Sequence, residues 1–195
     1  MAISNISGSS AIAGNKDSKA WDQTTSFGGF YPIQTIVVPS PGASSVSFTN
    51  IPQNFTHLQL RCAIRTNTKT QDYMKILYNN TDVVARHGWY TSNAGTPVAL
   101  GGTGATDMGA IPFLTDPGGV FDYAIIDILD YSNINKTKVI KAQSGYDLNG
   151  VSTNGQFVYI STFYNSTAPI TSLAPTLYYS TSYAPFSQFA LYGVK

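Results

Sequence analysis

The chain contains no glutamate and few charges of any kind. Ten of its 195 residues are acidic, all of them aspartate, and charged residues make up 11% of the sequence with a net charge of +1. Glutamate favours helices, so its absence beside 13 tyrosines and 10 phenylalanines favours β-structure. The only arginines are Arg61, Arg65 and Arg86. This argues against nucleic acid as a partner, because a phosphate-binding surface needs clustered cations.

Cysteine and long apolar runs are equally scarce. Cys62 is the only cysteine, so no internal disulfide can form, and its place in an alternating apolar run predicts a buried core residue. We find no basic and apolar leader and no apolar stretch of the ~18–20 residues that span a bilayer. We therefore expect a protein that is made in a cytoplasm and has no membrane partner.

The N-terminal segment differs from the rest of the chain. It is polar, rich in glycine and serine, and has no sustained period, so alone it buries too little apolar surface to offset the entropy of ordering. One interpretation is a disordered tail; the other is an extended arm, residues 1–32, that orders by docking its aromatic side chains on a partner. The candidate partner-binding residues are Trp21, Phe27, Phe30 and Tyr31.

Residues 33–195 alternate between apolar and polar side chains. In 57–66, Leu58, Leu60, Cys62 and Ile64 point one way and polar residues mostly the other. About ten such short runs separated by glycine, proline and asparagine predict one all-β domain, an antiparallel β-sandwich with an extended N-terminal arm. Two hairpins are predicted, one from 73–79 and 83–90 and one from 121–131 and 137–147. Pro175 is expected to interrupt 169–180.

Residues suited to catalysis or metal binding form no recognisable motif. His57 and His87 are the only histidines, and neither lies in a hydrolase or zinc motif. Segment 130–135 has oxygen ligands but lacks the glycine and the terminal acid of a calcium loop, so it predicts a turn with Asx-type hydrogen bonds. We predict no catalytic residue, no metal site, no cofactor and no enzymatic activity.

Three aspartates lie on the predicted strand 121–131. Alternation places Asp122 and Asp130 on one face and Asp127 on the other, so they cannot converge on one substrate. We expect each to end a strand or to pair with a cation. The nearby cations are Lys136, Lys138 and Lys141.

Aromatic residues crowd the C-terminal third. Core packing accounts for about half of such residues in our interpretation, and the others suit protein interfaces or the stacking of sugar rings. The set is Tyr159, Phe163, Tyr164, Tyr178, Tyr179 and Tyr183.

Three motifs carry a resemblance to a known group. The runs FTHLQLRCAIRT, AIIDILDYS with NKTK, and the C-terminal FSQFALYGVK resemble small virion proteins of tailed bacteriophages over roughly residues 33–195. This resemblance implies a jelly-roll-like sandwich, self-association that is often threefold, and a place on the virion after synthesis in the bacterial cytoplasm. Relatives often carry Gly-Ser before the last strand, where this chain has Ala184, Pro185 and Phe186.

The resemblance leaves the position on the particle open. The leading hypothesis is a capsid decoration or cement protein, a homotrimer whose arm binds the major capsid protein. The alternative is a tail-fibre or receptor-binding component that contacts host surface glycans. A glycan-cleaving enzyme is the third hypothesis, in which Asp122, Asp127 or Asp130 would be essential.

Overall fold

The computed structural model describes eight stretches of the chain. They are residues 29–67, 72–81, 84–93, 96–103, 109–111, 120–146, 156–178 and 182–195. These stretches contain eleven β-strands and no helix. The strands are β1 (Phe30–Val37), β2 (His57–Ile64), β3 (Asp72–Tyr78), β4 (Val84–Asn93), β5 (Thr96–Thr103), β6 (Gly109–Ile111), β7 (Asp122–Ile128), β8 (Lys138–Tyr146), β9 (Gln156–Tyr164), β10 (Leu173–Leu177) and β11 (Gln188–Val194).

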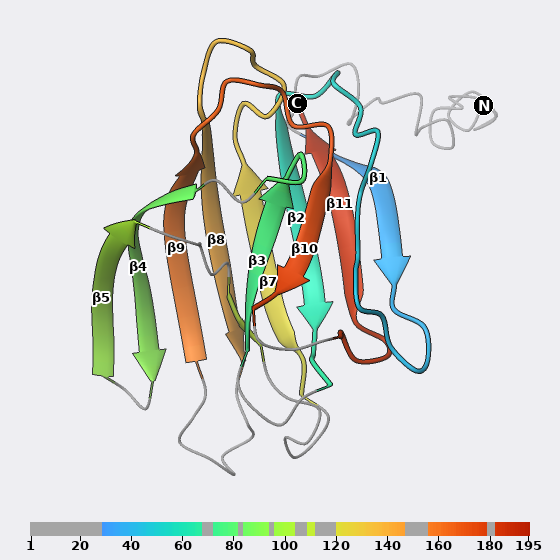
Figure 1. The fold of residues 1–195 in the computed structure, drawn as a ribbon, viewed down its shortest axis with the longest axis vertical. Helices are drawn as coiled ribbons and strands as arrows, with labels where there is room; N and C mark the ends of the chain where they lie inside the picture. Colours follow the sequence, from blue (N-terminus) through green and yellow to red (C-terminus); the bar gives the residue numbers. More distant parts are fainter. Residues whose placement is uncertain are drawn as a thin grey trace, which may run out of the picture.

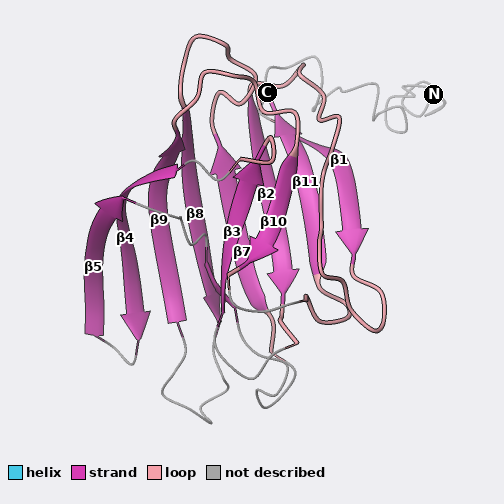
Figure 2. Ribbon diagram, in the orientation of Figure 1, coloured by secondary structure: helices cyan, strands magenta, loops and turns pink. Residues whose placement is uncertain are grey.

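The strands form two sheets of unequal size. The larger has eight strands in the order β1-β11-β2-β7-β8-β9-β4-β5, and the smaller has three in the order β10-β3-β6. All neighbouring strands that pair are antiparallel. The smaller sheet lies over one face of the larger sheet, so the molecule is a two-layered, asymmetric sandwich (Figures 1 and 2). The prediction of an all-β, antiparallel sandwich is confirmed.

The core lies between the two layers. Alternation in β2 buries the four residues predicted to face inward, Cys62 among them, and leaves the residues between them partly exposed. Strands β7 and β8 follow the same rule and pair as the predicted hairpin. The inward residues of the central strands are Leu58, Leu60, Cys62, Ile64, Ala124, Ile126, Ile128, Ile140, Ala142, Val158 and Ile160.

The prediction of a hairpin from residues 73–79 and 83–90 is wrong. Strand β3 pairs with β10 and β6 in the smaller sheet, whereas β4 pairs with β5 and β9 in the larger one. The short linker between β3 and β4 was compatible with a tight turn, but turn chemistry alone does not decide whether the chain crosses between layers.

The expectation that Pro175 interrupts a strand is wrong. Pro175 lies inside β10 rather than interrupting it, opposite Ile76 of β3. This is possible because β10 is an edge strand of the smaller sheet, where a missing N–H need not break a ladder.

Pro185 precedes Phe186, whose φ is +69°, and the Ser187 N–H donates to the Ala184 carbonyl at 3.3 Å. These features describe a type II turn, in which Phe186 holds the position that usually favours glycine.

Candidate functional site

The face of the larger sheet that points away from the smaller one, here called the outer face, carries exposed apolar side chains. Nine large apolar residues are exposed among the residues whose side chains the structure describes, and alternation places six of them on this face. They are Phe30, Val37, Tyr123, Val139, Phe157 and Tyr159. Because exposed apolar patches mark surfaces that bind a partner or ligand, the outer face is the candidate binding surface.

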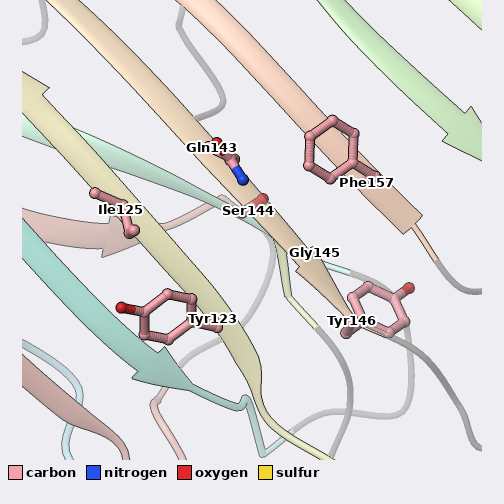
Figure 3. A pocket seen from close by; sticks show the side chains of 7 residues that line it. All are labelled: Tyr123, Ile125, Gln143, Ser144, Gly145, Tyr146 and Phe157. Atoms are coloured by element: carbon pink, nitrogen blue, oxygen red, sulfur yellow. The ribbon is translucent and has the colours of Figure 1, made fainter.

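A groove runs along β8 on the outer face, and we call it the β8 groove. Two adjoining hollows form it, with volumes of about 420 Å³ and 220 Å³ and with Ile125 and Gln143 lining both. Strand β8 supplies the floor, while β7 and β9 supply the two walls (Figure 3). Gln59 of β2 also lines the smaller hollow, so the groove is built by four strands that are contiguous in the sheet.

Strand register explains the hollow. Gly145 lies between Tyr123 of β7 and Phe157 of β9 in one row across the three strands. Because Gly145 has no side chain, the two aromatic rings stand on either side of a gap, two strand spacings or roughly 10 Å apart at the backbone. Tyr146 at the end of β8 also lines the groove here (Figure 3).

Polarity rises along the groove. The next row places Gln143 between Ile125 and Tyr159, and the third places Lys141 beside Asp127. Asp127 accepts a hydrogen bond from the Gln59 side-chain amide at 2.7 Å. One end of the groove is thus aromatic, and the other offers an amide, a cation and an anion.

A second aromatic feature lies at the β1 edge of the same face, and we call it the Phe30 stack. The Arg61 guanidinium lies over the rings of Phe30 and Tyr192, 4.6 Å and 4.7 Å from their centroids. Arg61 Nε also donates to Gln59 at 2.6 Å, which links the stack to the polar end of the β8 groove. The stack holds its arginine by cation–π contacts while Phe30 stays exposed.

A buried carboxyl lies directly behind the groove. Asp122 faces the core, and its Oδ1 accepts the Gly145 N–H at 2.8 Å. Its other oxygen has no hydrogen-bond partner among the described residues. Burial raises the pKa of Asp122 to about 7, partly opposed by the backbone hydrogen bonds from Gly145 and Tyr123.

A buried ammonium group lies at the opposite end of the β7–β8 hairpin. Lys138 Nζ donates to the carbonyls of Asn133 and Thr167 at 2.6 Å, of Lys136 at 3.0 Å and of Ser166 at 3.4 Å. Lys138 was predicted as a partner for an aspartate. Instead, it joins the turn after β7 to the loop after β9, whereas Lys136 pairs with Asp130 at 3.3 Å.

The predicted partner-binding residues divide between β1 and the undescribed N-terminal region. Trp21 and Phe27 lie outside the described residues. Strand β1 begins at Phe30, so residues 30–32 of the predicted arm belong to the sheet. Phe30 is exposed in the Phe30 stack, whereas Tyr31 is partly buried, with its ring centroid 5.5 Å from that of Phe55.

The three aspartates do not converge. Asp122 lies on the inner face and Asp127 on the outer face, as alternation predicted. The expectation that Asp130 shares a face with Asp122 is wrong, because β7 ends at Ile128 and Asp130 lies in the following turn with φ of +53°. The Asp130 N–H donates to His57 Nδ1 at 3.0 Å, which gives this histidine a role in the turn.

The remaining candidates are placed as follows. Segment 130–135 is a turn in which Asn133 Oδ1 accepts the Asn135 N–H at 2.8 Å, the Asx bond that was predicted. Tyr164 and Tyr183 are buried, Phe163 is partly buried, and Tyr159 and Tyr178 are exposed. Tyr179 lies outside the described residues, and His87 lies in β4, beyond those whose side chains are described.

Sequence reasoning missed most of the β8 groove. Gly145, Gln143 and Phe157 carry no motif, and only the pairing register brings them into adjacent rows. No cluster of metal-ligating side chains occurs among the described residues. Nor do those residues include a helix long and apolar enough to cross a membrane.

Comparison with models of known protein families found no match, and comparison with curated proteins found none either.

Proposed function

We propose that this chain is a structural protein of a tailed-bacteriophage virion, which works by self-association and by binding other virion proteins. The observation that carries the proposal is the outer face, where six exposed apolar side chains share one side of an eight-stranded sheet. Such a face suits burial against a partner. The sequence motifs that resemble virion proteins supply the setting.

Capsid decoration is the leading form of the proposal. Residues 1–29 connect directly to β1, the edge strand that carries the Phe30 stack. The proposed contact with the major capsid protein combines this segment with Phe30, and copies of the chain meet as a homotrimer.

Particle binding by truncated protein tests this role. Deleting residues 1–28 spares β1, so the truncated chain keeps its sheet. We expect it to fold with an unchanged circular dichroism spectrum and to lose attachment to capsids that lack the native protein. Full occupancy by the truncated chain would refute the cement role.

A receptor-binding component of the tail is the second candidate, favoured by the β8 groove. Aromatic walls and a polar floor suit a ligand with both apolar and hydroxyl surfaces. Labelled antibody on intact particles separates the two candidates, because cement predicts label on the head and receptor binding predicts label on the tail.

A further inference from the structure

We propose that the β8 groove binds an uncharged oligosaccharide, with one pyranose ring between Tyr123 and Phe157 over Gly145. This inference deepens the second candidate, the receptor-binding role, and names its ligand class. The two hollows together exceed the lower size of small-molecule sites, and they adjoin along β8. A linear ligand of several rings fits such a groove better than a compact one.

The charged residues that line the β8 groove favour an uncharged ligand. Asp127 and Lys141 are the charged residues that line the groove among the described residues, and they occupy neighbouring positions in one row. Their opposite charges leave no excess of either sign to attract a phosphate, a sulfate or an acidic sugar. They and Gln143 instead provide hydrogen-bond donors and acceptors for hydroxyl groups.

The backbone of β8 excludes an added peptide strand. Its hydrogen-bonding groups are paired on one side with β7 and on the other with β9. A peptide therefore cannot extend the sheet at this place, and a ligand must bind through side chains. An apolar protein surface would remove water from Gln143, Lys141 and Asp127 without offering them new hydrogen-bond partners, which is unfavourable.

The aromatic end of the β8 groove provides the apolar contact surface for the sugar. Tyr123 and Phe157 are exposed and flank a residue without a side chain (Figure 3). A pyranose ring presents a C–H face that packs on an aromatic ring and hydroxyl groups at its rim. The groove offers an aromatic surface beside polar groups in that same arrangement.

Titration of the full chain with neutral hexasaccharides tests the proposal. The probes are gluco-, galacto-, manno- and chito-hexasaccharides, with a heparin hexasaccharide as the charged comparison. Binding is followed by the NMR signals of the Gly145 amide and the Gln143 side-chain amide. We expect at least one neutral probe to shift both signals saturably and the heparin probe to leave them unchanged.

Two kinds of variant give the test its controls. Gly145→Val fills the hollow while placing a residue that favours strands at a position without positive φ, so the chain should fold and lose binding. Tyr123→Ala and Phe157→Ala should each weaken binding by about tenfold or more. Phe30→Ala removes an exposed aromatic from the same face outside the groove and should bind normally.

Three outcomes would overturn the proposal. One is that no neutral probe shifts the two signals. Another is that Gly145→Val binds as the unaltered chain does. The third is that Tyr123→Ala converts an oligomer into a monomer in sedimentation, which would make the groove an interface between copies. None of these results bears on head attachment through residues 1–28, so the cement role stands or fails separately.

Discussion

The two faces of β7, β8 and β9 use similar residues for different purposes. On the inner face, Ile126 and Ile140 are fully buried in the core, and even Asp122 and Lys138 are enclosed. On the outer face, Ile125 is only partly buried and Tyr123 is exposed beside it. Adjacent residues on one strand thus divide between the core and the exposed outer face, because side chains alternate across the sheet.

The two buried charged groups of the inner face, Lys138 and Asp122, differ in how completely they are hydrogen-bonded. Lys138 donates to four carbonyls, whereas Asp122 has a partner for only one oxygen. A fully hydrogen-bonded buried charge stabilises the elements it joins, and a half-satisfied one is a source of pH dependence. The inner face thus has one buried charge that is fully hydrogen-bonded and one that is only half-satisfied.

The largest expected effect is the loss of the Lys138 ammonium. Lys138→Met leaves four carbonyls without their donor, and we expect it to lower the free energy of unfolding by about 3–5 kcal/mol in urea denaturation. Lys136→Met is the matched control, because Lys136 is exposed and makes one ion pair, with an expected loss of about 0.5 kcal/mol. Equal losses in the free energy of unfolding for the two variants would contradict the claim that the buried Lys138 contributes more to stability than the exposed Lys136.

Neighbouring isoleucines test the two faces directly. Ile126→Ala creates a cavity in the core and should lower the free energy of unfolding by about 3 kcal/mol. Ile125→Ala removes the same atoms from the outer face and should lower it by about 1 kcal/mol or less. Chemical denaturation of both variants provides the measurement, and the reverse order would show that the faces are misassigned.

A smaller effect is expected at Asp122 and depends on pH. Its pKa rises from an ordinary 3.8 to about 7 on folding, so the folded state holds the proton more tightly than the unfolded state. The stabilisation is complete below about pH 4 and is lost as the pH rises through 7. Stability of the unaltered chain should therefore fall between pH 4 and pH 8.

Asp122→Asn should remove that slope. The amide keeps an acceptor for the Gly145 N–H and carries no charge, so we expect it to be the more stable chain at pH 8, by on the order of 2 kcal/mol. Thermal unfolding of both chains from pH 4 to pH 8 measures the difference. Parallel stability profiles would contradict the titration of Asp122.

The smallest effect concerns reactivity rather than stability. Burial raises the pKa of the Cys62 thiol, and the nearby Asp122 raises it further. Since the thiolate is the reactive form, Cys62 should not react with a disulfide reagent at pH 8 until the protein unfolds. Rapid labelling of the folded chain would show that the inner face is open to solvent.

The sequence was informative wherever one face of a strand is buried. Alternation predicted the inward side of β2 and the separation of Asp122 from Asp127, because burial imposes a period of two on the side chains. It could not predict that β3 and β4 belong to different sheets, since the pairing of distant strands leaves no local signal.

The candidate site was less predictable than the fold. The β8 groove depends on Gly145 lying in register with Tyr123 and Phe157, and the register is set by pairings across the whole hairpin. The carbonyls around Lys138 come from two separate loops and belong to the backbone, so no residue pattern reports them. Exposed aromatics were expected from composition, but their gathering on one face was not.

The most direct test of the outer face as the binding surface is hydroxyl-radical footprinting of the chain alone and within its particle. Four of the exposed aromatics, Phe30, Tyr123, Phe157 and Tyr178, should all react in the isolated protein. In the particle, Phe30 should be protected, Tyr123 and Phe157 should lose reactivity when a bound glycan is added, and Tyr178 should react throughout. Equal reactivity of Phe30, Tyr123 and Phe157 in every state would contradict the account.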